Sequence, residues 1–269
     1  MYKESPFVNV RVESGIASIK LTRAEALNSM HTPLATALRQ ALEAAAQDES
    51  VRCVLLEADG RYFMAGGDVP AFVEAYQLGG QAGLNTAITE LIKEAHGVIK
   101  AIRLMEKPVV AKVIGGAAGY GLSLVVACDF ALTHHEAAFT TAYAGIGTSP
   151  DGGTTFFLPR MLGVKKAAEL IMLSDKVTGE QAADLGVVNK SVGKEDLDAA
   201  CTELLQRLVT GPTFSYGRAK QLLNQSLNST LFEQLDAEAQ SFSACGGTQD
   251  FVNAIQAFAR KEKATFEGV

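Results

Sequence analysis

Two glycine-rich turns carry residues whose chemistry is recognisable from the sequence. They are Ala65-Gly66-Gly67-Asp68 and the run GGAAGYG at residues 115–121, and each follows an apolar stretch and precedes a helical pattern. Glycine lets backbone N–H groups approach a ligand closely, and a helix N-terminus adds positive potential there. Two such turns facing one point would form an oxyanion hole. Taken singly, each turn is explained equally well by tight packing of a strand against a helix.

A single carboxylate stands in the run SPDGG at residues 149–153, within a glycine-rich neighbourhood. An Asp in this position commonly caps the helix that follows. A carboxylate in a partly desolvated pocket also gains basicity and suits proton transfer at carbon. Two interpretations of Asp151 therefore stay open, a helix cap and an acid/base group.

Strand and helix patterns alternate along most of the chain and would position these segments. Strands are expected at 8–12, 17–22, 51–58, 109–114 and 128–133. Helices are expected after residue 68, at 84–105, at 122–127 and from Pro33, with Thr32 as its N-cap. At least three strand-and-helix repeats predict an α/β domain. From about residue 195 the pattern is helical only. We therefore divide the chain into an α/β core, residues 1–205, and a helical C-terminal region, residues 206–269.

Composition excludes several classes of protein. The 269 residues carry 24 basic and 30 acidic side chains, a formal charge of −6, with a pI near 5.3. A nucleic-acid binder would show a basic stripe instead. The longest uncharged stretch, residues 113–128, is too short and too rich in glycine to cross a bilayer, and the first residues lack a secretion signal. Four isolated cysteines indicate reduced thiols, so we expect a cytoplasmic protein. The charge and the lack of a long apolar stretch predict that it binds neither nucleic acid nor membrane.

Motifs spread over the whole chain resemble those of the crotonase, or enoyl-CoA hydratase/isomerase, superfamily. They lie in the same order, at residues 22–30, 62–72, 115–132, 139–163 and 257–266. The resemblance implies an α/β core built as a spiral of ββα units. It also implies C-terminal helices used for trimer assembly, giving a homotrimer or a dimer of trimers, with mean hydropathy of +0.12 consistent with apolar surface between subunits.

The resemblance further implies an acyl-CoA substrate whose thioester oxygen lies between two backbone N–H groups. By motif position these donors are the N–H groups of Ala65 and Tyr120. Hydratases of the superfamily carry two glutamates, and the matching positions here are Ser123 and Tyr143. Asp151 instead matches the single carboxylate of isomerase-type relatives. One carboxylate suffices to take a proton from one carbon and return it to another. We therefore expect a double-bond shift in an enoyl-CoA, within fatty acid metabolism.

Substrate-binding residues also follow from the resemblance. They are Ala24, Ala26, Leu27, Ala65, Gly66, Gly67, Asp68, Val69, Tyr120, Tyr143, Phe258 and Lys261. Phe258 and Lys261 match positions that reach the CoA of a neighbouring subunit, although an exposed lysine on a helix explains Lys261 equally well. Asp68 is expected to cap a helix rather than to take part in the chemistry. Coenzyme A enters only as part of the substrate, with no tightly bound cofactor, and four scattered histidines predict no metal site.

Several alternatives stay open at this point. The protein could be a hydratase using one carboxylate, a CoA-ester dehalogenase or hydrolase with Asp151 as nucleophile, or an acyl-CoA binder that has lost catalysis. Gly119-x-Gly121 also resembles part of a dinucleotide fingerprint, but Leu124 stands where its third glycine is required. Phe72 and Tyr76, in the region that shapes the acyl pocket of relatives, suit fatty or aromatic acyl groups.

Overall fold

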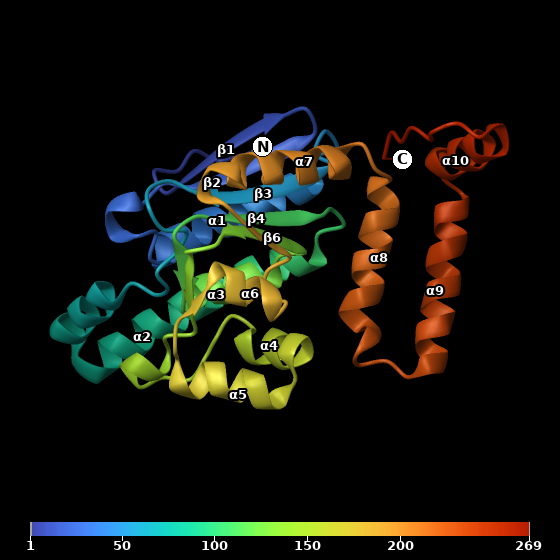
Figure 1. The fold of residues 1–269 in the computed structure, drawn as a ribbon. Helices are drawn as coiled ribbons and strands as arrows, with labels where there is room; N and C mark the ends of the chain where they lie inside the picture. Colours follow the sequence, from blue (N-terminus) through green and yellow to red (C-terminus); the bar gives the residue numbers. More distant parts are fainter. Residues whose placement is uncertain (1, 269) are drawn as a thin grey trace.

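The computed structural model describes residues 2–268, and its centre is a six-stranded sheet (Figure 1). The strand order is β1-β2-β3-β4-β6-β9. Only β1 and β2 pair antiparallel; the other neighbours are parallel. The strands are β1 (Val8–Glu13), β2 (Ile16–Leu21), β3 (Cys53–Ala58), β4 (Val109–Val113), β6 (Phe130–His134) and β9 (Lys190–Val192). A second, three-stranded sheet contains β5 (Gly116–Ala118), β7 (Ala138–Thr140) and β8 (Val177–Thr178).

Helices cover the six-stranded sheet on both faces. The helices of the described chain are α1 (Thr32–Gln47), α2 (Val69–Leu104), α3 (Tyr120–Ala127), α4 (Thr154–Leu162), α5 (Val164–Leu173), α6 (Gly179–Asp184), α7 (Leu197–Val209), α8 (Thr213–Ser226), α9 (Leu231–Gly246) and α10 (Gln249–Arg260), and α1, α2, α3 and α7 contribute to the packing on the sheet. On β3, Val54 and Leu56 join the larger apolar core with α1, α2 and α3, whereas Cys53 and Leu55 pack with α7. Strand alternation thus buries both faces of β3, as its nearly continuous apolar sequence predicts.

The observed helices differ from the sequence expectation at Thr32 and agree with it in the two segments of α2. Thr32 does not cap α1: the helix begins at Thr32 itself, and His31 occupies the N-cap position without a side-chain bond. The helix expected at 84–105 is the second part of α2, which starts at Val69 and passes through a non-helical Gly80 (φ 58°, ψ −152°). Glycine tolerates that conformation, and the chain kinks there between two helical segments.

The last three helices form an arm, residues 213–268, beside the α/β body (Figure 1). Residue 205, our boundary, lies inside α7, which packs on the sheet, and the arm begins with α8. Arg52, just before β3, binds both ends of the arm: it donates to the Thr213 hydroxyl at 3.1 Å and to the Phe266 carbonyl at 3.0 Å. Lys220 on α8 also pairs with Asp129 at 2.7 Å. The arm is therefore attached to the body by buried polar contacts.

Candidate active site

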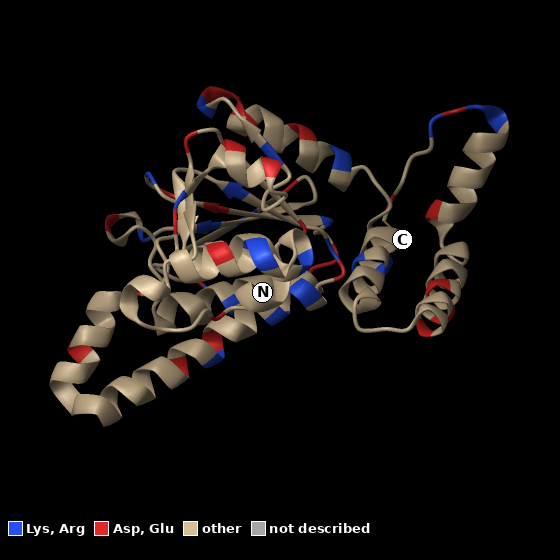
Figure 2. Cartoon of the chain, turned by 60° about the horizontal axis from the view of Figure 1, so that its bottom comes forward, with Lys and Arg blue, Asp and Glu red and all other residues tan. Residues whose placement is uncertain are grey.

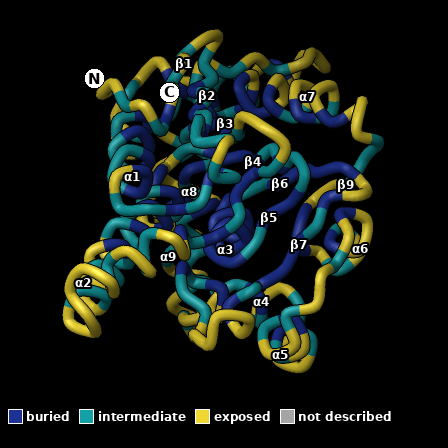
Figure 3. The backbone as a smooth tube through the Cα atoms, turned by 90° about the vertical axis from the view of Figure 1, so that its left-hand side faces the viewer, coloured by how far each residue is buried: buried dark blue, intermediate teal, exposed yellow. Residues whose placement is uncertain are grey.

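The two glycine turns lie against each other in the middle of the body. Met64 and Ala117 form a parallel β-bridge, and the Ala118 N–H donates to the Met64 carbonyl at 2.9 Å. A Cβ added to Gly66 would lie 3.1 Å from the Ala118 carbonyl oxygen. The turns thus meet in van der Waals contact, beside α3, which is buried along its whole length (Figure 3).

The first turn offers a free donor, but at Gly67 and not at Ala65. The Ala65 N–H donates to the Leu27 carbonyl at 3.0 Å, so the expectation that it binds the substrate oxygen is wrong. The Gly66 carbonyl accepts from the Met30 N–H at 2.7 Å. Since C=O and N–H of one trans peptide point in opposite directions, the Gly67 N–H points away from Met30. No acceptor within residues 2–268 engages it.

The second turn offers the N–H of Tyr120, the first residue of α3. The Gly119 carbonyl of the same peptide accepts from the N–H groups of Leu122 and Ser123, at 3.0 and 3.2 Å. The Tyr120 N–H therefore points out of the helix N-terminus, and the described part of the chain supplies no acceptor for it. The Tyr120 hydroxyl donates to the Ala95 carbonyl at 2.6 Å, which fixes the residue. Burial, and then the nearby Asp151, raise the pKa of this phenol well above its ordinary value.

Asp151 reaches the same region from the loop before α4. Its backbone carbonyl accepts from the Ser123 hydroxyl at 3.1 Å and from the Thr154 N–H at 3.2 Å. Its side chain does not cap α4, whose N-cap is Gly153 with no side-chain bond. Instead, carboxylate Oδ1 accepts from the Tyr143 hydroxyl at 2.6 Å. The capping interpretation is therefore wrong, and the other oxygen, Oδ2, has no partner among residues 2–268.

Ser123 and Tyr143, the positions matched to hydratase glutamates, are brought together by the fold. Their hydroxyl oxygens lie 2.8 Å apart, and Ser123 Oγ is also 2.6 Å from Thr154 Oγ1. Ser123 is 0% exposed. Burial, and then Asp151, raise the pKa of Tyr143 well above its ordinary value, so this phenol stays a hydrogen-bond donor. The cluster contains no second carboxylate, and the Ser123 hydroxyl is fully engaged with protein atoms.

His96 on α2 also contacts this loop, and the sequence patterns did not single it out. Its Nε2 accepts from the Gly152 N–H at 3.4 Å, at the long end for a hydrogen bond. His96 is half-buried and adjoins Ala95, which binds the Tyr120 hydroxyl. Because the residue has no neighbouring histidine, cysteine or acid in a metal-binding pattern, only its position in the fold could reveal the contact.

The residues expected to bind the CoA moiety form a continuous strip at the first turn. Ala24 and Ala26 lie in a 3-10 helix, followed by Leu27, whose carbonyl binds the Ala65 N–H. The Met30 carbonyl accepts from the Asp68 N–H at 2.9 Å. Asp68 caps α2 through the Ala71 N–H at 3.2 Å and pairs with Arg23 at 2.5 Å, as a capping role predicts. The strip contains Ala24, Ala26, Leu27, Ala65, Gly66, Gly67, Asp68 and Val69.

Two expected CoA contacts lie elsewhere. Phe258 and Lys261 are at the end of α10 on the arm, where Phe258 is 85% exposed. The fold does not bring them to the glycine turns of the same chain (Figure 1). Near the turns, the first part of α2 exposes Val73, Tyr76 and Leu78, and Glu74 is its only charged residue before Glu90 (Figure 2). This apolar face is where the acyl region was expected.

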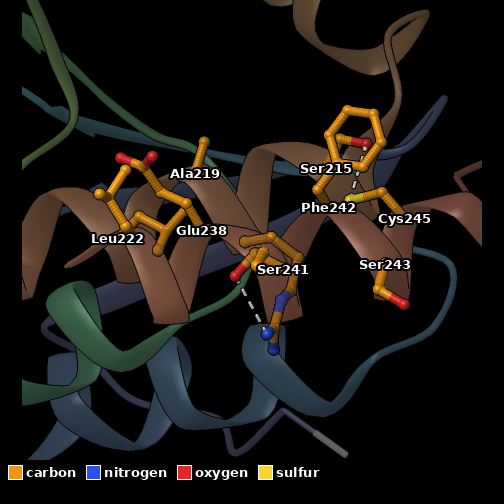
Figure 4. A pocket seen from close by; sticks show the side chains of 11 residues that line it. Ser215, Ala219, Leu222, Glu238, Ser241, Phe242, Ser243 and Cys245 are labelled. Atoms are coloured by element: carbon orange, nitrogen blue, oxygen red, sulfur yellow. Dashed lines mark hydrogen bonds between the residues drawn. The ribbon is translucent and has the colours of Figure 1, made fainter. Parts of the chain in front are cut away.

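A cavity of about 830 Å³ lies on the arm, away from Asp151. Side chains of α8 and α9 line it, including Leu222, Glu238 and Phe242 (Figure 4). Within residues 2–268 no cluster of His, Cys, Asp or Glu has metal-binding geometry. No helix in the described part of the chain is long and apolar enough to cross a membrane.

Comparison with known proteins decides the family. The sequence pattern of the family described as Enoyl-CoA hydratase/isomerase matches residues 11–269. The chain belongs to the enoyl-CoA hydratase/isomerase family. It is 31% identical to the 1,2-epoxyphenylacetyl-CoA isomerase of Escherichia coli (strain K12), over 97% of this chain and 98% of that protein. It is 28% identical to the 4-chlorobenzoyl coenzyme A dehalogenase-2 of an Arthrobacter species, covering 95% and 91% of the two chains.

Solved structures confirm the fold. An enoyl-CoA hydratase from Polaromonas sp. JS666 superposes with a TM-score of 0.89 at 29% identity, over 97% of this chain and 99% of that one. The α/β core is thus of the crotonase type, as the resemblance implied, and the chain is an enzyme of the enoyl-CoA hydratase/isomerase class. The family assigns Gly119-x-Gly121 to a turn of the crotonase fold and not to a dinucleotide fingerprint.

Proposed function

We propose that the protein moves a double bond in an enoyl-CoA from the 3- to the 2-position. The Asp151 carboxylate removes a proton from C2 of the acyl group. The resulting negative charge spreads onto the thioester oxygen, which the N–H groups of Gly67 and Tyr120 bind. The carboxylic acid of Asp151 then returns a proton to C4, which gives the conjugated 2-enoyl-CoA and restores the carboxylate.

The main support for this proposal is the position of the Asp151 carboxylate, which has one unpartnered oxygen in the described chain, beside the N-terminus of α3. Asp151 is held through Oδ1 by Tyr143, so Oδ2 remains available for proton transfer. Its loop touches the donor turn, because a Cβ added to Gly152 would lie 3.0 Å from the Tyr120 ring. The loop that carries the base is therefore in contact with the turn that carries the Tyr120 donor. Each preorganised donor is worth about 3 kcal/mol in a transition state of this kind.

Hydration fits the site less well. Adding water across a double bond needs groups that hold and deprotonate the water, the task of two glutamates in hydratases of this superfamily. Here Ser123 is buried and its hydroxyl contacts Tyr143, Thr154 and the Asp151 carbonyl. The Ser123 hydroxyl is thus engaged with protein atoms, and a single carboxylate favours isomerisation.

The test is the variant Asp151→Asn with a straight-chain 3-enoyl-CoA in deuterium oxide. Asn keeps the oxygen that accepts from Tyr143, and the Asp151 backbone contacts do not depend on the side chain. We expect conjugated product and deuterium incorporation to fall about a thousandfold. Asp175→Asn, at an exposed Asp after α5, serves as control. Undiminished proton exchange in folded Asp151→Asn would remove Asp151 from the mechanism.

A second candidate is displacement of halide from a haloaryl-CoA, with Asp151 Oδ2 as nucleophile. The unpartnered oxygen and the similarity to a named dehalogenase favour it. In this reaction the carboxylate forms an aryl ester as halide leaves, and water then hydrolyses the ester. Halide release from 4-chlorobenzoyl-CoA, measured beside 3-enoyl-CoA isomerisation, separates the two functions. Binding of both thioesters without turnover would instead support an acyl-CoA binder.

We also propose that the arm assembles the protein into a trimer or a dimer of trimers. Large apolar side chains are exposed on α8, α9 and α10, namely Leu223, Leu227, Leu231, Phe232, Phe242 and Phe258. An exposed apolar surface of this kind marks a protein interface. In such an assembly Phe258 and Lys261 would contact the CoA bound to a neighbouring subunit. Sedimentation equilibrium should give three or six times the mass of 28.4 kDa.

A further inference from the structure

We propose that His96 is a positioning residue that fixes Asp151 through the Gly152 N–H. The proposal rests on the acid/base role of Asp151 in the proposed function. His96 belongs to α2, whereas Asp151 and Gly152 belong to the loop before α4. Its contact with that loop therefore joins two elements that are distant in the sequence.

The loop that carries Asp151 has little other support on its N-terminal side. Residues 144–149 are exposed, and a Cβ added to Gly145 or Gly147 would meet no atom within 4 Å. The position of Asp151 must therefore come from contacts at and after this residue. Those contacts are the Tyr143 hydroxyl on its side chain and the hydrogen bonds of the peptide between Asp151 and Gly152.

This peptide is bound at both of its polar ends. Its carbonyl, from Asp151, accepts from Ser123 on α3 and from Thr154 on α4. Its N–H, from Gly152, donates to His96 on α2 at 3.4 Å. Bonds on opposite sides fix the rotation of a peptide plane, and that plane sets the direction of the Asp151 side chain. Without His96 the plane is held from one side only.

The packing around Gly152 leaves little room for this residue to move. Gly152 has φ +59°, and an added Cβ would lie 2.7 Å from the Ser123 Cβ. The residue is thus pressed against α3 on one side while His96 binds it on the other. A small rotation of this peptide would move the carboxylate relative to the acyl carbons. A shift of about 1 Å at a reacting group can cost a hundredfold in rate.

The contact also requires that residue 96 supply a hydrogen-bond acceptor as far from the backbone as the histidine Nε2. Because Gly152 is the donor, Nε2 is unprotonated and the ring hydrogen is on Nδ1. The Oε1 of a glutamine lies about as far from the backbone as Nε2, whereas the Oδ1 of an asparagine corresponds to Nδ1. His96→Gln should therefore keep the bond to Gly152, and His96→Asn should lose it.

The experiment measures a ratio that does not depend on how much enzyme is active. A 3-enoyl-CoA is converted in deuterium oxide, and protium and deuterium are counted at C4 of the product. A well-placed Asp151 delivers the proton that it took from C2 before exchange with solvent. In His96→Asn we expect the protium-to-deuterium ratio to fall about threefold and kcat about tenfold, with KM nearly unchanged. His96→Gln should lie close to the parent enzyme in both, as should the control His135→Asn, at an exposed histidine.

A second measurement tests the contact without using catalysis. The Gly152 amide should exchange with solvent about tenfold faster in His96→Asn than in the parent protein or in His96→Gln. Unchanged amide exchange in His96→Asn would overturn the proposal, as would a parent-like isotope ratio in that variant. If the parent enzyme isomerises no 3-enoyl-CoA, the proposed function fails, and the amide measurement alone then decides whether His96 holds the loop.

Discussion

The two sides of the candidate site are built differently. On the donor side, the glycine turns press backbone against backbone: a Cβ added to Gly121 would lie 2.3 Å from the Met64 carbonyl oxygen. On the side of the base, a Cβ added to Gly145 would meet nothing within 4 Å, and Asp151 is held by a few hydrogen bonds. The donors are thus fixed by packing, whereas the carboxylate is fixed mainly by polar contacts, with close packing only where Gly152 meets α3.

This difference matches what each side must do. An oxyanion hole gains from donors that do not reorganise when charge appears, and close packing of backbone supplies that rigidity. A single acid/base group must reach two carbons of the substrate in turn, which a loop held by side-chain hydrogen bonds allows. Changes on the donor side should therefore affect folding and catalysis together, while changes on the base side should affect catalysis with a small effect on stability.

The largest effect is expected from Gly121→Ala. The added methyl would overlap the Met64 carbonyl and push the two turns apart, so we expect a loss of about 3 kcal/mol in the free energy of unfolding. This corresponds to a fall in Tm of roughly 6 to 12 °C. Turnover of 3-enoyl-CoA should fall about a hundredfold because the donors separate. Thermal unfolding and initial rates measure the two effects.

Gly145→Ala is the matched control for that variant. Both glycines have ordinary negative φ, so the two substitutions differ mainly in the space around the new methyl. We expect Gly145→Ala to change Tm by less than about 2 °C and to leave the rate within about twofold. Equal losses in both variants would show that packing does not distinguish the two sides.

A smaller effect, confined to catalysis, is expected from Tyr143→Phe. This change removes the donor to Asp151 Oδ1 and leaves the ring in place. The carboxylate can then rotate, so kcat should fall about tenfold. The loss of stability should be about 1 kcal/mol, the ordinary contribution of one hydrogen bond.

Tyr62→Phe controls for the loss of a half-buried hydroxyl. The Tyr62 hydroxyl donates to the Ala138 carbonyl at 3.1 Å and has no hydrogen bond to Asp151. The substitution Tyr62→Phe should reduce the free energy of unfolding by a similar amount without lowering kcat. If Tyr143→Phe behaved like Tyr62→Phe, the polar hold on Asp151 would be unimportant.

The sequence predicted the donor side better than the side of the base. Glycines 66, 116 and 121 indicate close backbone approach because only glycine fits there, so the two tight turns followed from residue types, and their joint position followed from the family resemblance. The donor in the first turn was nevertheless placed at Ala65. That placement was wrong because the Ala65 N–H binds the Leu27 carbonyl, which belongs to a segment distant along the chain. Residue types do not show which carbonyl an N–H meets.

The contacts that hold Asp151 were harder to predict. Ser123 was recognised only as a departure from a glutamate pattern, Tyr143 as such a departure and as a substrate-binding residue, and Asp151 kept a competing interpretation as a helix cap. The bonds from Tyr143 and His96 join residues 8 and 56 positions away from the atoms that they bind. A half-buried histidine on a long helix has no local pattern that marks it. Such contacts depend on tertiary packing, which a single sequence does not specify residue by residue.

The smallest expected effect concerns pH and the donor side. His31 precedes α1 and adjoins Met30, whose N–H binds the first turn. The Nδ1 of His31 is buried without a partner in the described chain. Burial, and then Arg23, lower the pKa of His31 from 6.5. The folded chain therefore takes up this proton less readily than the unfolded chain. The associated stability is fully present above pH 6.5 and is lost as pH falls below it. Since His31 is only half-buried, the loss should stay under about 1 kcal/mol.

Urea unfolding of the parent protein and of His31→Gln, between about pH 8 and about pH 5, isolates this contribution. The difference in the free energy of unfolding between the two proteins removes the titration of the other three histidines, which both share. The parent should lose more stability than His31→Gln as the pH falls, while the isotope ratio of the product, which reports on Asp151, should be the same in both. A change in that ratio would mean that the donor side and the base side are coupled through the first turn. The two sides would then respond together to protonation of His31, although one is held by packing and the other by hydrogen bonds.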